Sequence, residues 1–540
     1  MFNFNFDAST LEVQNLSFTT YDNDKGQVFG TATATLPTLL MKVFNKTDIN
    51  LGVDCMAELQ LANADVVFVL DTTGSMAGSP IQGLRDAVLD FHRTLNTAIK
   101  DTQTRVRYGF VPYSMSVNAR DLVANGELPL DYLVNSHDYQ SREAIFNTPA
   151  YVGTTTVTGS STESQPNMSY WQCNSWATNG GNNPVTTSGT PPADTTEVTY
   201  AKVSGPSYWS TGTCTRSVTS SQTSYTTKYK FTTWRYTRVP LDTSVYKTLA
   251  SVPVATSLNS SSYVDTAGTY DPITLAAMNG TTASGIGTSN YSWDGCIEER
   301  DTVDASSWDP IPSGAHDLDI DSAPVDAATS WRPRWRQLEF DRTNPAYEDS
   351  TSNRSNAYNS CPSPMELLKQ ADLSSNPTDV PVWLQDYIDG LVANGYTYHD
   401  IGMIWGDRLI STRGIFADNV NAGNLRAVSR NIIFMTDGIM NPNLDAYDSY
   451  GIEKLDNRVA PQGSTYNDLV ARHTARFLAA CQAAKAMGVT VWVIAFNTQL
   501  TDELKQCSSD GRAYLSNNTD ELRQTFKFIA SKVADLRLGQ

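Results

Sequence analysis

The sequence predicts a doubly wound α/β fold with a mostly parallel sheet, an N-terminal β segment and a large β-rich insertion. Two stretches, 64–113 and 431–537, alternate apolar strands with amphipathic helices. Strands that are apolar throughout indicate a sheet covered on both faces, and their alternation with helices indicates parallel pairing. Between these stretches, residues 121–378 are rich in Ser, Thr and aromatic residues and lack this alternation.

Residues 62–120 are predicted to form the first part of the α/β domain. Apolar runs at 64–70 and 106–113 predict strands, and the amphipathic stretch at 80–99 between them predicts a helix. A strand, a helix and a strand in this order make a unit whose two strands run parallel.

The first 61 residues are predicted to be a separate β-rich segment. Stretches 27–37 and 48–59 are candidate strands, and residues 1–6 already alternate as a strand does. No basic and apolar signal peptide precedes them, so we expect Met1 to begin a truncated sequence.

Residues 121–378 are predicted to be an insertion into the α/β domain. Aromatic residues alternate over 225–231 and then change parity at Trp234, which predicts a strand with a bulge. Stretches 153–165 and 179–196 are rich in turn-forming residues, and we expect loops or partly disordered segments there.

Residues 379–540 are predicted to complete the α/β domain. Apolar runs at 431–435 and 489–496 predict strands, and the stretches 466–487 and 519–537 predict helices. The two glycines at 402 and 406 lie on one helical face and are expected to allow close packing on the sheet.

Charge and hydropathy exclude several classes of partner. The chain has 57 acidic and 39 basic residues, a net charge of -18, and no basic run. It is therefore expected to repel nucleic acids and anionic membranes. Its longest apolar runs, such as 66–70, fall short of the roughly 20 residues that span a bilayer, so the chain as given is expected to be soluble.

The seven cysteines contain no CxxC pair of the kind that binds zinc, and disulfides are the preferred interpretation. Cys481 precedes a predicted strand and Cys507 follows the next loop, so both lie toward one end of that strand. The pairs 173–214 and 296–361 follow by elimination, which leaves Cys55 unpaired. The alternative is a cytosolic protein with packed, unpaired cysteines.

A candidate metal site begins at Asp71-Thr72-Thr73-Gly74-Ser75, directly after a buried strand. Ligands of α/β sheets bind beyond the carboxyl ends of strands. The carboxylate of Asp71 and the hydroxyls of Thr73 and Ser75 stand at alternate positions, and oxygen ligands suit a hard cation such as Mg²⁺, with Mn²⁺ or Ca²⁺ as alternatives.

Two later loops are predicted to converge on the same point. Thr397 lies between two predicted helices, and Asp437 follows the apolar strand at 431–435. Taken singly, each of these residues is ordinary, because Asp71 and Thr397 could cap helices and Asp437-Gly438 could be a turn. Their order along the chain favours a shared metal site.

The five residues resemble the metal-ion-dependent adhesion site of the von Willebrand factor A (vWA) family, whose pattern is Asp-x-Ser-x-Ser with a distant Thr and a distant Asp before Gly. Asp71, Ser75, Thr397 and Asp437 match that pattern, and Thr73 replaces its middle serine. The resemblance implies a Rossmann-like vWA fold and a cation whose remaining position takes an acidic group of a partner.

A wider resemblance links the chain to TadG-like proteins of Flp (tight adherence) pilus assembly. It rests on FVLDTTGSM, WDGC, YHDIGMIWG, IIFMTDGIMN and the stretch from Cys481 to Cys507. The resemblance implies an extracytoplasmic location and a pilus or cell-surface protein as partner. Members of that family begin with a membrane anchor, which this chain lacks.

Enzymatic activity is not expected. His399-Asp400 has no accompanying nucleophile and is expected to orient its loop. Glu298-Glu299 and the acids of 317–326 could be paired catalytic carboxylates but are expected to form a solvated face. The aromatic clusters Tyr170-Trp171, Tyr208-Trp209 and Trp331 with Trp335 could form a sugar or protein platform, although core packing is preferred.

The sequence therefore predicts a metal-dependent adhesion module that binds a protein carboxylate. Two other functions stay open. One is a structural scaffold of the pilus machinery with a vestigial metal site. The other is an exported hydrolase with the insertion as its substrate domain.

Overall fold

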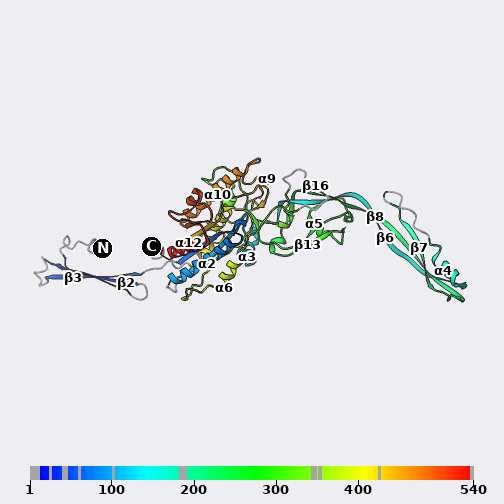
Figure 1. Ribbon diagram of the computed structural model, residues 1–540, viewed down its shortest axis with the longest axis horizontal. Helices are drawn as coiled ribbons and strands as arrows, with labels where there is room; N and C mark the ends of the chain where they lie inside the picture. Colours follow the sequence, from blue (N-terminus) through cyan, green and yellow to red (C-terminus); the bar gives the residue numbers. More distant parts are fainter. Residues whose placement is uncertain are drawn as a thin grey trace.

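The computed structural model describes residues 13–22, 27–38, 47–58, 63–99, 104–181, 190, 192–341, 349–350, 355–423 and 427–535. The molecule is elongated (Figure 1). A body of helices and strands lies in the middle, with a small sheet at one end and a long arm at the other.

A six-stranded sheet forms the centre of the body. Its order is β17-β5-β4-β18-β21-β22. The five strands from β5 to β22 pair in parallel, and β17 is antiparallel at the edge. The strands are β4 (Asn63–Asp71), β5 (Val106–Tyr113), β17 (Glu366–Gln370), β18 (Val428–Thr436), β21 (Thr490–Phe496) and β22 (Ala513–Ser516).

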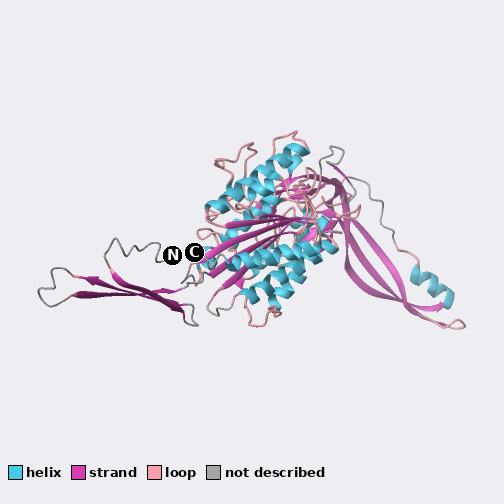
Figure 2. Cartoon of the chain, turned by 60° about the vertical axis from the view of Figure 1, so that its left-hand side comes forward, coloured by secondary structure: helices cyan, strands magenta, loops and turns pink. Residues whose placement is uncertain are grey.

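Helices cover both faces of this sheet (Figure 2). On one face lie α2 (Ser79–Ala98), α6 (Val382–Asp389) and α12 (Thr519–Asp535). On the other lie α7 (His399–Ile410) and α10 (Tyr466–Ala486). Every residue of β4 is buried because both of its faces are covered.

Two glycines let α7 lie close to the sheet, as the sequence predicted. A Cβ at position 402 would lie 2.5 Å from Cδ1 of Tyr113, and one at 406 would lie 2.6 Å from Cγ2 of Val69. Larger residues at these positions would push the helix away from the sheet.

The fold class predicted from the sequence is wrong for this chain. The chain is β-rich, with 37% strand against 27% helix. Of the six sheets in the described residues, five are antiparallel and the six-stranded sheet is mixed. The prediction gave too much weight to the alternating stretches. It found the strand with a bulge around 225–234, which is present with a register shift between Phe231 and Thr233. It missed the outer parts of the long strands, whose faces are both open to solvent and need no apolar alternation.

The arm is the main source of this difference. β6 (Ser136–Ser169) and β8 (Thr211–Asp242) pair antiparallel along nearly their whole lengths, and β7 (Thr195–Ser204) pairs with β8. α4 (Tyr170–Thr178) lies at the far end (Figure 1). The loop predicted at 153–165 is therefore part of a strand, and half of the stretch 179–196 lies outside the described residues.

The N-terminal sheet is antiparallel and contains β1 (Gln14–Asp22), β2 (Gln27–Pro37) and β3 (Asp48–Glu58). The last two match the predicted strands at 27–37 and 48–59. The strand predicted at 1–6 and the side chain of Cys55 lie outside the described residues.

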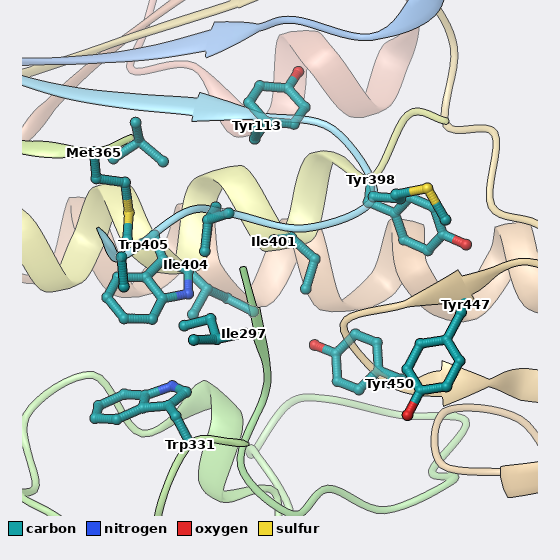
Figure 3. Packing of buried hydrophobic residues seen from close by; sticks show 14 of the residues in the cluster. Tyr113, Ile297, Trp331, Met365, Tyr398, Ile401, Ile404, Trp405, Tyr447 and Tyr450 are labelled. Carbon is teal, nitrogen blue, oxygen red and sulfur yellow. The ribbon is translucent and has the colours of Figure 1, made fainter. Parts of the chain in front are cut away.

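Much of the stretch between β8 and α6 packs against α7 rather than extending with the arm (Figure 3). Ile297 and Trp331 lie against Ile404 and Trp405 of α7.

The remaining α-helices and β-strands of the described residues are α3 (Arg120–Ala124), β9 (Val252–Ser257), β10 (Tyr263–Val264), β11 (Gly268–Tyr270), α5 (Pro272–Met278), β12 (Ala283–Ser284), β13 (Gly287–Tyr291), β14 (Ile297–Glu298), β15 (Arg332–Pro333), β16 (Asp349–Ser350), α8 (Ala417–Asn421), β19 (Tyr447–Asp448), β20 (Gly451–Ile452), α9 (Glu453–Asp456) and α11 (Asp502–Cys507).

Three of the acids predicted to form a solvated face, Glu298, Glu299 and Asp317, are buried, whereas Asp326 is exposed as predicted. Glu299 is 0% exposed and pairs with the buried Arg408 at 3.0 Å, and it accepts a hydrogen bond from Trp331. Asp317 is also buried and pairs with Arg476 of α10. These charges join the insertion to the helices of the body, because a buried carboxylate requires a partner.

The three predicted disulfides are present, at 173–214, 296–361 and 481–507. Three disulfides are typical of proteins from oxidising, extracytoplasmic compartments. Among the described residues, none of the helices is long and apolar enough to cross a membrane.

Candidate functional site

Three loops meet beyond the carboxyl ends of β4 and β18. These two strands are parallel neighbours, so the residues that follow them lie at the same edge of the sheet. The third loop joins α6 to α7. Its Gly395 carbonyl accepts a hydrogen bond from the Gly74 N–H at 2.9 Å, and its Asn394 N–H donates to the Thr72 carbonyl at 2.7 Å.

Four of the predicted ligands form one hydrogen-bonded chain. Asp71 accepts at Oδ1 from the Thr73 N–H at 2.9 Å. The hydroxyls of Thr73 and Ser75 lie 3.0 Å apart, and the Ser75 hydroxyl donates to Asp437 Oδ1 at 2.6 Å. A carboxylate from each of two strands and two hydroxyls from one turn therefore lie together.

Thr397 lies at the border of this group. Its carbonyl accepts a hydrogen bond from the Asn441 N–H at 2.9 Å, which ties its loop to the loop after β18. A Cβ placed on Gly438 would lie 3.7 Å from the Thr397 hydroxyl, so that hydroxyl is next to the residue that follows Asp437.

The two carboxylates lack a neutralising partner. Asp71 is fully buried, and burial raises its pKa. Burial, together with the nearby charge of Asp71, raises the pKa of Asp437 to about 7. Among the described ion pairs, none joins a basic side chain to either residue. A bound cation would remove the repulsion between them.

Thr436 is a site residue that the sequence reasoning missed. Its hydroxyl donates to Asp71 Oδ2 at 2.7 Å and accepts from the Gly438 N–H at 3.2 Å. It thereby fixes the second oxygen of Asp71. Its position directly before the Asp-Gly pair, at the end of an apolar strand, was the only signal in the sequence.

His399 holds the Thr436 hydroxyl in place through a hydrogen bond. Its Nε2 lies 3.0 Å from the Thr436 hydroxyl, and burial lowers the pKa of His399 to about 4, so the ring is neutral near pH 7. Because the Thr436 hydroxyl donates to Asp71, the imidazole N–H donates to Thr436. Asp400 does not pair with His399, since it contacts His473 and Arg476 of α10.

A hollow of about 150 Å³ opens beside the three loops. Gly438 and His399 border it on the side of the predicted site, and its other walls are mainly apolar, with Met440, Phe477 and Leu504. A group bound at the predicted site would therefore have an apolar recess next to it.

No protein-family model and no curated protein matches the chain. Among solved structures, the open conformation of the pilus adhesin SpaC from Lactobacillus rhamnosus GG is 8% identical, with a TM-score of 0.30. A second SpaC structure is 7% identical, with a TM-score of 0.31. Both alignments cover 96% of this chain and 34% of SpaC, so the chain spans about a third of that adhesin's length.

The proximal thread matrix protein 1 from the mussel byssus is 18% identical, with a TM-score of 0.18. That alignment covers 32% of this chain and 34% of the other. With TM-scores below 0.5, these likenesses carry no argument about the fold or function of this chain.

Proposed function

We propose that Asp71, Thr73, Ser75, Thr397 and Asp437 bind one divalent cation, Mg²⁺ or Mn²⁺, and that the chain uses it to hold a partner protein. The role is adhesion or assembly at the cell surface or on a pilus, without turnover. The observation that supports it is the pair of carboxylates, buried Asp71 and half-buried Asp437, with hydroxyls between them and no basic partner among the described residues.

The donor set fits a hard cation. Carboxylate and hydroxyl oxygens are the ligands that Mg²⁺ takes, and the described site offers no sulfur or imidazole ligand that would favour zinc. Thr436 holds Asp71 in place through its second oxygen, and His399 holds Thr436. Such outer contacts orient the ligands of metal sites.

A bound cation would supply an open coordination position for an oxygen of the partner. The chain's own part is to present that position at the surface. Ser75 is exposed and Thr73 is buried beneath it, so the site opens outward past Ser75. The partner we propose is a pilus or cell-surface protein that offers an acidic side chain.

Calorimetry with Mn²⁺ tests the metal site. We expect the native chain to bind one Mn²⁺ and the Asp437→Asn variant, which keeps the size of the side chain, to bind at least about tenfold more weakly. Asp389→Ala removes an exposed carboxylate at the end of α6 and is expected to leave binding unchanged. Absence of Mn²⁺ binding to the native chain would overturn the proposal.

A second experiment separates adhesion from a scaffold role. We expect Asp437→Ala to impair pilus assembly or surface attachment in a cell that carries the protein, and Asp389→Ala to leave both intact. Equal assembly and attachment with Asp437→Ala would support a scaffold whose metal site is vestigial.

A further inference from the structure

The far end of the arm carries exposed aromatic side chains that the proposed metal site does not use. Trp209 is 92% exposed, Trp171 is 64% exposed and Tyr208 is 50% exposed. With Tyr170 they form one cluster, which we call the tip platform. The platform comes from the first turn of α4 and from the loop between β7 and β8.

The rings of the tip platform contact one another. The ring centroids of Tyr208 and Trp209 are 4.7 Å apart, those of Tyr170 and Tyr208 are 5.3 Å apart, and those of Trp171 and Tyr208 are 5.7 Å apart. Tyr208 is therefore the centre of the group. By contrast, Trp331 and Trp335 are fully buried in the body, so the exposed rings at the tip do not serve a core.

The backbone beneath the platform is fixed. The disulfide 173–214 ties α4 to the start of β8, and Ser169 and Gln172 form a capping box at the start of α4. The Lys202 ammonium donates a hydrogen bond to the Asn174 side chain, and its Nζ lies 5.1 Å from the centroid of the Tyr170 ring. A platform held in advance loses little conformational freedom when it binds a ligand.

The exposed aromatic area alone is smaller than one side of a typical protein interface. Three rings with these exposed fractions offer about 300–500 Å², whereas a specific protein partner covers roughly 800 Å² on each side. The groups around the rings are polar, with exposed Gln172, Ser207 and Ser210. Lys202 is a basic side chain at this platform, so a lipid surface is tested as the alternative ligand below.

We propose that the tip platform binds a carbohydrate, with the apolar C–H face of a sugar ring stacked on Trp209 or Trp171. Sugar rings present an apolar face and a rim of hydroxyls. The rings of the platform match the face, and the amide and hydroxyl side chains beside them match the rim. This site is independent of the metal site, because it lies at the opposite end of the arm (Figure 1).

Binding to an array of glucose, mannose, galactose and N-acetylglucosamine oligosaccharides tests the proposal. We expect the native chain to bind at least one of these sugars, in the presence of EDTA as well. The double variant Trp171→Ala with Trp209→Ala is expected to lose at least about tenfold in affinity. Tyr21→Ala, which removes an aromatic ring that is 62% exposed in β1, is the matched control and is expected to bind as the native chain does.

Circular dichroism of the double variant checks that the fold is kept, which the exposure of both side chains predicts. The proposal is overturned if the native chain binds none of the sugars, or if the double variant binds them as well as the native chain. It is equally overturned if the two tryptophans are needed only for binding to neutral phosphatidylcholine vesicles.

Discussion

The body and the arm are built from strands that are stabilised in different ways. In the body, β4 is buried over its whole length between two layers of helices. In the arm, β6 is exposed over most of its outer half and is paired with β8 by backbone hydrogen bonds. Hydrophobic burial therefore dominates in one region, and strand pairing with a disulfide dominates in the other.

This difference separates the two proposed sites. The proposed metal site lies at the end of buried strands, where it would share the stability of the core. The tip platform depends on local restraints, namely the disulfide 173–214 and the cap of α4. Perturbing one region should thus leave the other site intact.

The largest expected effect is in the body. Phe68 of β4 is fully buried and its ring contacts Phe91 and Phe110 at centroid distances of 5.2 and 5.1 Å. Phe68→Ala is expected to lower the free energy of unfolding by about 3–5 kcal/mol, measured by urea denaturation. Val157→Ala on the exposed face of β6 should change it by less than about 0.5 kcal/mol, and a similar loss there would contradict the comparison.

Removing one disulfide from the body or one from the arm should have different effects on stability. The pair of substitutions Cys481→Ser and Cys507→Ser is expected to lower the stability of the body by about 2–4 kcal/mol. The pair Cys173→Ser and Cys214→Ser should instead speed hydrogen exchange in α4 and leave the urea midpoint of the body unchanged. A shift of that midpoint would show that the arm and body unfold together.

A smaller effect concerns Glu453 in the body. It accepts hydrogen bonds from the Val459 and Ala460 N–H groups, and burial raises its pKa to about 7. In the unfolded chain the Glu453 carboxyl loses its proton near pH 4.5. The contribution of the protonated carboxyl to the free energy of unfolding is therefore complete below that pH and is lost as the pH rises through 7.

The Glu453→Gln variant has no carboxyl to ionise, so it does not lose stability in this way as the pH rises. Its free energy of unfolding relative to that of the native chain is expected to rise by about 1–3 kcal/mol between pH 5 and pH 8, measured by urea denaturation at both pH values. The exposed Asp389→Asn is the control and should show no such trend. A constant difference across this range would show that Glu453 ionises normally.

The smallest effect lies in the arm. The hydroxyls of Thr155 and Thr223 are 2.7 Å apart across β6 and β8. A double-mutant cycle with valine at both positions is expected to give a coupling of about 0.2–1 kcal/mol, measured by hydrogen exchange of the neighbouring amides. A zero coupling would mean that the backbone ladder alone holds this part of the arm.

The sequence predicted individual elements of the body better than the fold class of the chain. The strand predicted at 431–435 is β18 and the helix predicted at 466–487 is α10, because apolar periodicity is strong where a face is buried. The stretch 153–165 gave no such signal, since a strand exposed on both faces has no apolar side.

The candidate site shows the same limit. Asp71, Ser75 and Asp437 could be placed together because each follows or closely follows a predicted buried strand, and in the structure a chain of hydrogen bonds through Thr73 links them. Thr436 could not be assigned, because its role depends on which oxygen of Asp71 it meets. The burial of Glu299 was also hidden, since its partner Arg408 is far away in the sequence.

The length of β6 sets the reach of the molecule. A strand of 34 residues extends over at most roughly 110 Å, so a ligand at the tip and a partner at the body would be held at a spacing of that order. Once one site has bound its ligand, the other site can reach only the volume within the length of the arm. Its binding then depends on the effective concentration within that volume, not on the concentration of the protein in solution. The length of the arm would thus favour binding to surfaces on which both ligands occur at this spacing.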